Sequence, residues 1–289
     1  MGDMLQRFTF EHAPVRGEIV QLDAAWRAVL ERHDYPPPLQ TLLGECMAVA
    51  ALLAATLKFD GAMILQMHGS GPVKLLVVEC MSDYTLRATA KWHGDVSEGP
   101  LARMLGDGRC VITLVPRESG QSYQGIVTLT GESIAEALQH YMLVSEQIDT
   151  RITLAADAAR AAGMLLQRLP GAESEDADAW RRASILGATL TGGEILRLPA
   201  SAIISRLFHE EDLRLFEPQP LAFRCSCTRE RVSDMLRMLG RAEVESILSE
   251  HGNIEVDCEF CNRRYLFDSI DAEQLFAPTP APETQSIRH

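Results

Sequence analysis

The sequence predicts an α+β fold in three parts: a large antiparallel-sheet domain with packed helices, a helical linker, and a small C-terminal domain organised by four cysteines. Three observations indicate this. Strand-like runs separated by short turns follow one another between residues 62 and 130, which favours an antiparallel sheet. Residues 39–58 are apolar nearly all round, as in a helix at the centre of a core. Four of the seven cysteines fall within residues 225–261.

The first domain, residues 1–170, opens with two strands and a capped helix. Strands are expected at 7–11 and 15–22, and Asp23 can cap a helix over 24–32 that ends before three prolines. After the core helix, the expected strands are 62–68, 73–80, 84–92, 109–116 and 123–130. A helix over 133–147 and strands at 150–157 and 163–168 complete the domain.

Residues 171–178 are acidic and poor in large apolar side chains, which makes them the best domain boundary. The linker, residues 171–221, combines many Leu, Ile and Phe residues with helix-breaking positions such as Gly187, Gly192 and Gly193. Each interior glycine costs about 1 kcal/mol relative to alanine, and short helices need a tertiary surface to persist. We therefore expect a helical linker that is marginally stable and depends on its neighbours.

Two cysteine pairs, Cys225-Ser226-Cys227 and Cys258-Glu259-Phe260-Cys261, are separated by thirty residues. In an extended segment, side chains two positions apart leave the same face, so Cys225 and Cys227 can point at one centre. A turn at Glu259 and Phe260 would bring the second pair together. Four converging thiolates form a soft, tetrahedral donor set that suits one structural zinc ion. An iron–sulfur cluster fits less well, because the pairs bracket a mini-domain as in structural zinc sites.

The domain that carries the cysteines, residues 222–275, is expected to be small and metal-dependent. Thr228 can cap a helix that ends at Gly240 and whose apolar stripe is Val232, Met235, Leu236 and Leu239. A second helix over 242–250 and a hairpin follow. Such a unit is marginal alone, so metal must supply much of its folding energy, on the order of 10–16 kcal/mol in comparable peptides. The proline-rich residues 276–289 are expected to be disordered.

Composition excludes several classes of function. The formal charge of −13, with a pI near 5.1, argues against a nucleic-acid or anionic-membrane partner, since phosphate-rich partners are bound by excess Lys and Arg. The longest apolar run, residues 47–57, is too short to span a membrane, and the N-terminus has no secretory-signal pattern. We expect a cytoplasmic protein, whose reducing compartment keeps its thiols free.

Other candidate sites have structural interpretations. Cys46, Cys80 and Cys110 each lie within an apolar helix or strand, as small buried hydrophobic residues do. His251 fits a helix end better than a metal ligand. Ser145-Glu146-Gln147 is more simply explained by capping or by hydrogen bonds between elements than by catalysis. Because no Ser-His-Asp or paired-carboxylate pattern can be assembled, we do not expect an enzyme.

Several stretches resemble the redox-regulated bacterial heat-shock chaperonin family of thirty-three kilodaltons. They are residues 223–232 and 258–262 around the cysteines, with Tyr265, Phe267 and Asp268 following, and 123–127, 145–147 and 207–211 upstream. The resemblance covers nearly the whole chain except the last dozen residues. The family more often has Ser where this chain has Thr228, which keeps the capping hydroxyl. The resemblance implies an ATP-independent holdase that is inactive when reduced and zinc-bound, is activated by oxidative stress to bind unfolded client proteins, and forms a homodimer when oxidised.

A physical argument leads to the same switch. Zinc keeps the four sulfurs as thiolates, the species that oxidants attack, so oxidation should release zinc, unfold residues 222–270 and deprive the linker of its packing partner. On oxidation we expect disulfides Cys225–Cys227 and Cys258–Cys261, since loop closure costs least for the nearest partners. Two rivals stay open: a zinc-stabilised protein-interaction module without redox switching, and a dithiol oxidoreductase that uses Cys258 and Cys261, although the thioredoxin-like βαβ context is missing.

Overall fold

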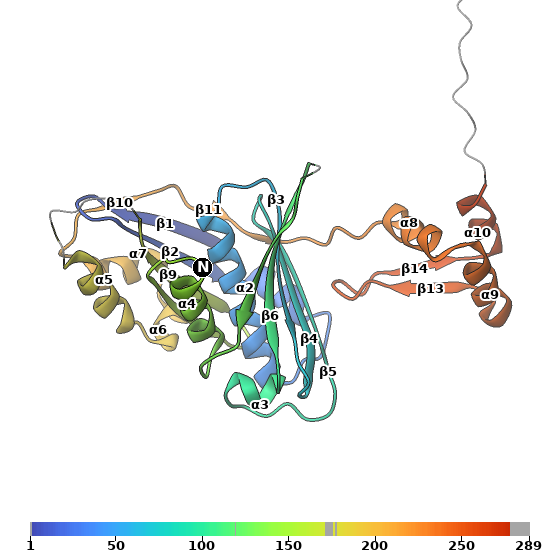
Figure 1. Ribbon diagram of the computed structural model, residues 1–289, viewed down its shortest axis with the longest axis horizontal. Helices are drawn as coiled ribbons and strands as arrows, with labels where there is room; N and C mark the ends of the chain where they lie inside the picture. The colour runs from blue at the N-terminus through green and yellow to red at the C-terminus, as the bar shows by residue number, and fades with distance from the viewer. Residues whose placement is uncertain (1, 119, 171–175, 177, 278–289) are drawn as a thin grey trace, which may run out of the picture. The chain divides into compact units, whose positions relative to one another are not determined.

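The computed structural model describes residues 2–118, 120–170, 176 and 178–277. The chain divides into two compact units, Met1–Arg224 and Cys225–His289, which we describe separately (Figure 1). Most of the acidic stretch expected as a domain boundary, and residues 278–289 of the expected disordered tail, lie outside the described residues. The first unit contains two six-stranded sheets and packed helices, so the predicted α+β class is confirmed.

One sheet contains the expected run of consecutive strands. Its order is β12-β5-β4-β3-β6-β7, and all neighbours are antiparallel except β12 and β5. Along β3 and β4, buried residues alternate with more exposed ones, as in a sheet with one face on the core. The strands are β3 (Gly61–His68), β4 (Val73–Met81), β5 (Thr85–Trp92), β6 (Arg109–Pro116), β7 (Tyr123–Thr128) and β12 (Ala222–Phe223).

The other sheet joins the beginning and the end of the first unit. Its order is β10-β1-β2-β9-β8, with β11 paired to β1. The linker is helical as expected but also contains the unexpected short strands β10 and β11, and β12 directly follows it. These strands are two or three residues long and are defined by pairing with β1 or β5, so they have no periodicity of their own. The strands are β1 (Met4–Phe10), β2 (Val15–Leu22), β8 (Thr150–Ala156), β9 (Ala161–Arg168), β10 (Leu213–Leu215) and β11 (Gln219–Pro220).

Helix α2 (Pro37–Thr56) is the expected core helix and contacts strands of both sheets. By length and composition it is apolar enough to cross a membrane, but 78% of its apolar window is buried inside the protein, as in a core helix. Helix α4 (Ile134–Val144) is capped by Ser133, whose hydroxyl accepts a hydrogen bond from the backbone of Glu136. The short helix α3 (Leu101–Leu105) was not expected from the sequence.

The predicted cap of the first helix is wrong in its chemistry. Asp23 precedes α1 (Ala24–Leu30), but its carboxylate forms an ion pair with Arg27 at 2.6 Å and makes no capping hydrogen bond. The carboxylate of Asp3 accepts instead, from the backbone N–H groups of Asp23 at 2.6 Å and Ala25 at 3.1 Å. The donors at this helix end are thus satisfied from about twenty residues away, which local sequence does not reveal.

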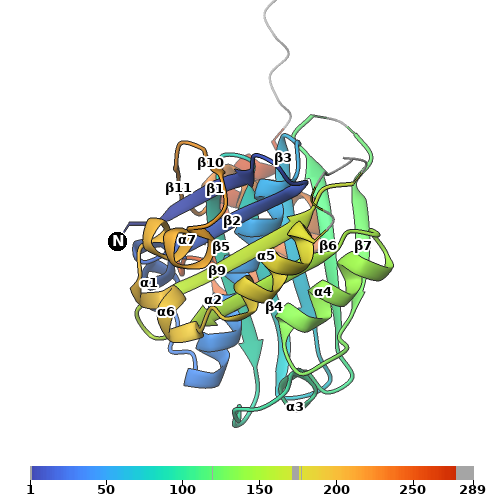
Figure 2. The same cartoon turned by 90° about the vertical axis from the view of Figure 1, so that its left-hand side faces the viewer.

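The linker contains three short helices that cover one face of the sheet formed by β1, β2 and β9 (Figure 2). They are α5 (Ala179–Ala188), α6 (Gly192–Arg197) and α7 (Ala200–Phe208). Gly187, expected to interrupt a helix, lies within α5, where a Cβ atom would come within 2.7 Å of Leu166 Cδ1. Gly192 lies in the first turn of α6, behind a capping box formed by Thr191 and Glu194. These glycines therefore allow close packing and helix initiation.

The second unit has the expected two helices and hairpin. Its core is small, and the buried members of its described part are Leu236, Val244, Ile254, Tyr265, Phe267 and Ala272. Thr228 caps the first helix as predicted, since its hydroxyl accepts from the backbone of Arg231 at 3.2 Å. The elements are α8 (Arg229–Leu239), α9 (Arg241–His251), β13 (Ile254–Asp257), β14 (Arg264–Phe267) and α10 (Ser269–Leu275), the last not expected.

Half of the apolar stripe predicted for α8 is wrong. Leu236 is buried and Val232 packs against the small core, but Met235 and Leu239 are 44% and 51% exposed. Periodicity placed these four residues on one side of a helix, but the core of a unit this small covers only part of that side. The second unit thus buries even less apolar surface than its sequence suggested.

Candidate metal centre

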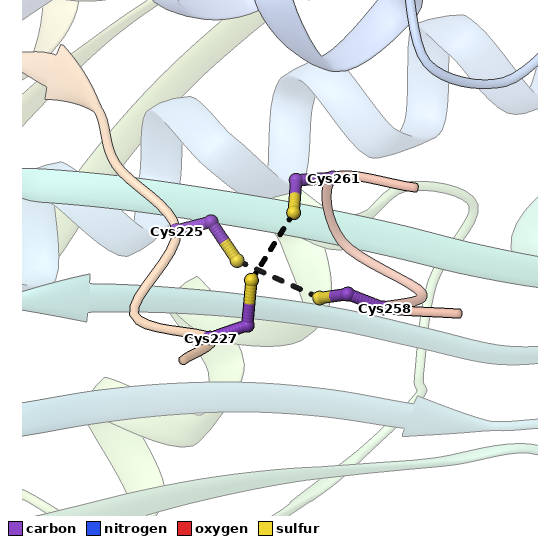
Figure 3. A group of neighbouring side chains, drawn as sticks. All are labelled: Cys225, Cys227, Cys258 and Cys261. Carbon is purple, nitrogen blue, oxygen red and sulfur yellow. Dashed lines mark hydrogen bonds between the residues drawn. The ribbon is translucent and has the colours of Figure 1, made fainter. Parts of the chain in front are cut away.

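The four paired cysteines come from two segments of the second unit. Cys225 and Cys227 lie in the extended segment before α8, and Cys258 and Cys261 flank the turn between β13 and β14. Their side chains point toward a common centre (Figure 3). Cys225 Sγ lies 3.6 Å from Cys258 Sγ, Cys227 Sγ lies 3.3 Å from Cys261 Sγ, and all four sulfurs lie within 4.8 Å of one another. The structure thus brings together the residues that the spacing predicted.

The donor set fits a single zinc ion. Zn–S bonds of about 2.3 Å in a tetrahedron place the sulfurs about 3.8 Å apart, and the Cys225–Cys258 and Cys227–Cys261 sulfur distances of 3.6 Å and 3.3 Å are near that value. Sulfurs that all lie within 4.8 Å of one another leave room for one ion, whereas a multi-iron cluster would hold its ligands around several metal atoms. All four donors are thiols, which are soft ligands and unsuited to calcium or magnesium.

The pKa values of the clustered thiols also indicate that the centre binds a cation. Partial burial opposes ionisation of Cys227, but hydrogen bonds from Tyr265 and the other thiols outweigh it and lower the pKa of Cys227 to about 7. Burial, with the neighbouring thiols, raises the pKa of Cys261 to about 12, and burial raises the pKa of Cys258 as well. One thiolate is therefore readily formed, but four crowded thiolates need a positive charge among them.

The second cysteine pair is held by the backbone of its turn. The amide of Cys258 donates to the carbonyl of Arg263 at 3.0 Å, and the amide of Asn262 donates to the carbonyl of Cys258 at 2.7 Å. Asn262 has a φ of 55°, a left-handed conformation that Asn adopts more readily than most residues. Backbone groups of Phe260 and Cys261 hydrogen-bond to the thiol of Cys258, and that of Arg263 to the thiol of Cys261.

Three side chains that the sequence analysis did not connect with the centre support it. The hydroxyl of Tyr265 donates to Cys227 Sγ at 3.2 Å. Arg231 donates to the carbonyl of Ser226, between the first two cysteines, at 3.0 Å. Arg229 lies over the ring of Phe267 at 4.2 Å and pairs with Asp271 at 2.8 Å, which joins α8 to α10. Tyr265 and Cys227 are 38 residues apart, and no local pattern signals the contact.

The remaining cysteines lie where the sequence analysis expected them, in the core. Cys46, Cys80 and Cys110 have no exposed surface. Burial raises the pKa of Cys80 and of Cys110 to about 12 and raises the pKa of Cys46 well above its usual value, so these thiols stay protonated. His251 lies at the end of α9, and the metal-ligand group found in the described residues contains cysteines alone. None of these residues forms a second thiolate centre.

The Ser145-Glu146-Gln147 motif connects two elements by hydrogen bonds. The carboxylate of Glu146 accepts from the hydroxyl of Tyr141 at 2.6 Å and from that of Tyr123 at 3.2 Å. These contacts link the segment that follows α4 to the start of β7, which is also the start of the stretch 123–127 named in the sequence analysis. The motif thus forms hydrogen bonds between elements, as the sequence analysis expected.

Comparisons with known proteins agree with one another. A family model described as "Hsp33 protein" matches residues 3–268. A 33 kDa chaperonin from Chromobacterium violaceum is 53% identical over 289 residues, covering 99% of this chain and 98% of the relative. One from Methylobacillus flagellatus is 53% identical over 291 residues, covering 100% and 99%. The crystal structure of a 33 kDa chaperonin, a heat shock protein 33 homologue from Thermotoga maritima, has a TM-score of 0.81 at 23% identity, covering 95% and 98%. The last likeness concerns the fold.

Proposed function

This chain belongs to the Hsp33 family, and we propose that it is an ATP-independent holdase whose zinc-bound thiolates keep it inactive until they are oxidised. The names of its relatives support a chaperone function. One observation carries the redox part of the proposal. Four sulfurs converge in a unit with a very small core, and that unit directly follows an apolar linker made of short helices.

The second unit is expected to need the metal in order to fold. Its described part buries only six apolar residues, and two of the four residues in the apolar stripe predicted for α8, Met235 and Leu239, are exposed. Cys225, Cys227, Cys258 and Cys261 would hold zinc and contribute binding energy on the order of 10–16 kcal/mol, as in zinc-dependent peptides. Loss of the ligands therefore unfolds the unit.

Oxidation by hydrogen peroxide removes the ligands in pairs. One thiolate sulfur attacks the O–O bond, forms an S–O bond and releases hydroxide. A second thiolate attacks that sulfur, forms the disulfide and releases another hydroxide, so each pair loses the two electrons that the peroxide gains. A disulfide sulfur carries no negative charge and is a poor zinc ligand. Two disulfides thus leave the site with no thiolate ligand.

The linker supplies the apolar surface. Its helices α5, α6 and α7 are ten, six and nine residues long, too short to persist alone in water. They are held by a cluster in which Ile203, Leu207 and Phe208 pack against Phe8 and Phe10 of the sheet. If this packing is lost, the apolar side chains of both the helices and the sheet become exposed and available to an unfolded client.

The linker is joined to the centre through a short anchor. Ala222 and Phe223 form β12, which pairs with β5, and the amide of Arg224 donates to the carbonyl of Leu86 at 3.0 Å. Cys225 follows at once. When the second unit unfolds, the end of the linker is therefore attached to a flexible chain rather than to a folded domain, and we propose that its packing on the sheet weakens as a result.

The remaining parts of the proposal concern partners and location. The partners are unfolded or partly folded clients, and a second copy of the chain in the oxidised state, as the family resemblance implies. The acidic net charge of −13 supports the absence of a nucleic-acid or membrane partner. Free thiols at rest suit the cytoplasm.

Light scattering of a chemically unfolded client tests the function. We expect the reduced, zinc-loaded chain to leave aggregation unchanged and the peroxide-oxidised chain, at equal concentration, to suppress it, with zinc appearing in solution in parallel. Suppression by both forms, or by neither, contradicts the proposal. Retained zinc together with oxidation-dependent suppression would show that the cysteines are not the switch.

The disulfide pairing gives a separate prediction. We expect Cys225–Cys227 and Cys258–Cys261 after complete oxidation, because the second unit unfolds and the nearest partners then close the smallest loops. The folded centre itself does not impose this pairing, since Cys225 Sγ contacts Cys258 Sγ at 3.6 Å and Cys227 Sγ contacts Cys261 Sγ at 3.3 Å, across the two pairs. Peptide mapping under non-reducing conditions distinguishes the two sets. Mainly cross-pair bridges would show that the disulfides form before the unit opens.

A further inference from the structure

The two cysteine pairs are supported in different ways. Backbone groups of Phe260, Cys261 and Arg263 hydrogen-bond to the second pair, and these donors belong to the turn itself. The hydroxyl of Tyr265 reaches a sulfur of the first pair from another element, at 3.2 Å from Cys227 Sγ. The Tyr265 hydroxyl thus connects Cys227 to the hairpin, in addition to the contact between Cys227 Sγ and Cys261 Sγ at 3.3 Å.

The fold places this hydroxyl with little freedom. Tyr265 lies in β14 opposite Val256 of β13, and its ring is 7% exposed within the core of the second unit. The guanidinium group of Arg263 lies beside the same hydroxyl. A zinc-bound cysteine is a thiolate with no proton to give, so the Tyr265 hydroxyl must be the donor in the contact.

We propose that Tyr265 is a positioning and tuning residue of the metal centre, which holds Cys227 in ligating geometry and slows its oxidation. This inference rests on the redox role proposed above. A hydrogen bond to a thiolate withdraws electron density from the sulfur, and the donor also occupies one side of it. Because metal binding keeps Cys227 deprotonated in either case, the hydroxyl changes the reactivity of the thiolate rather than its amount.

The effect on oxidation follows from the first chemical step. Cys227 sulfur attacks hydrogen peroxide, forms the S–O bond as the O–O bond breaks and releases hydroxide, and a neighbouring thiolate then closes the disulfide and releases a second hydroxide. The Tyr265 hydroxyl competes for the lone pair that makes the attack. Its removal therefore makes Cys227 a better nucleophile and a less well-oriented ligand.

Tyr265→Phe in the full-length chain tests the inference, because it removes the hydroxyl and keeps the buried ring. We expect about tenfold weaker zinc affinity in competition with a chelator, as for other groups that orient metal ligands. We also expect a shifted sulfur-to-cobalt charge-transfer band in the cobalt-substituted protein and faster zinc release with peroxide. Ile247→Val is the control, since Ile247 packs against the same core and has no side-chain group that could donate a hydrogen bond to a sulfur.

The outcomes distinguish a failure of the role proposed for Tyr265 from a failure of the proposed holdase function. Wild-type values for Tyr265→Phe in all three measurements, or changes no larger than those of Ile247→Val, overturn the role of Tyr265. The chelator and cobalt measurements use reduced protein without a client. A chain that fails to become a holdase on oxidation would therefore contradict the proposed function while leaving a shifted cobalt spectrum in support of Tyr265. Absence of a thiolate–cobalt band in the wild type contradicts both.

Discussion

Reduced Cys258→Ser protein is expected to suppress client aggregation with little or no oxidant, a gain of function produced by a broken site. A hydroxyl is a far weaker zinc ligand than a thiolate, so the centre loses one of its four donors. The backbone groups of Phe260 and Cys261 also lose the sulfur atom to which they hydrogen-bond. The second unit then loses a large part of a binding energy on the order of 10–16 kcal/mol and should unfold at ordinary temperature.

Light scattering with reduced wild type and reduced Cys258→Ser at equal concentration measures this effect. Cys46→Ala is the matched control, because it removes a thiol that is buried in α2 and belongs to no metal centre. Three outcomes are distinct. A catalytic thiol predicts loss of activity under every condition, and a static zinc site predicts a destabilised protein with no new binding. If the variant protects no better than the wild type, restraint by the metal centre is wrong, whatever its zinc content.

The second large effect is expected from Phe208→Ala, which weakens the linker without touching the cysteines. Phe208 is 2% exposed, and its ring centroid lies 5.7 Å from that of Phe8 and 5.3 Å from that of Phe10. Truncation of a buried Phe lowers the free energy of unfolding by about 3–5 kcal/mol. Helices of this length are not stable on their own, so they cannot compensate for the lost packing. We expect the reduced, zinc-loaded variant to bind clients partially, because the surface under the linker opens while the centre stays intact.

The experiment combines zinc content with client protection for the reduced variant. Ile185→Ala is its control, since Ile185 lies on the same linker at 57% exposure and contributes little to packing. Client protection by Phe208→Ala with full zinc, and none by Ile185→Ala, supports the linker as the covered site. A zinc-loaded variant whose linker is open but which protects no client would place the binding surface elsewhere.

Local patterns in the sequence were sufficient for much of the site and the fold. Cysteine spacing placed four sulfurs at one centre, and the Thr228 cap formed as predicted. Contacts between distant residues could not be obtained in this way. Asp3 caps a helix that Asp23 was expected to cap, and Tyr265 reaches Cys227 across 38 residues. Neither partner has a local signature.

The linker shows why propensity alone misleads. Gly187 was expected to break a helix, but the structure has it within α5, where the absence of a side chain lets that helix approach Leu166. The strands β10, β11 and β12 exist only through their pairing with β1 and β5. The stability of this segment therefore depends on the sheet beneath it, which is consistent with the marginal stability that its composition indicated.

Amide hydrogen exchange of the linker, before and after oxidation of the same protein, tests the central claim most directly. The claim is that loss of the thiolate centre releases the packing of residues 179–223 on the sheet. We expect these amides to be protected in the reduced, zinc-bound protein and to lose protection as zinc is released, while residues 123–147 stay protected in both states. Equal protection of the linker in the reduced and the fully oxidised protein would contradict the claim, even if the oxidised protein binds clients.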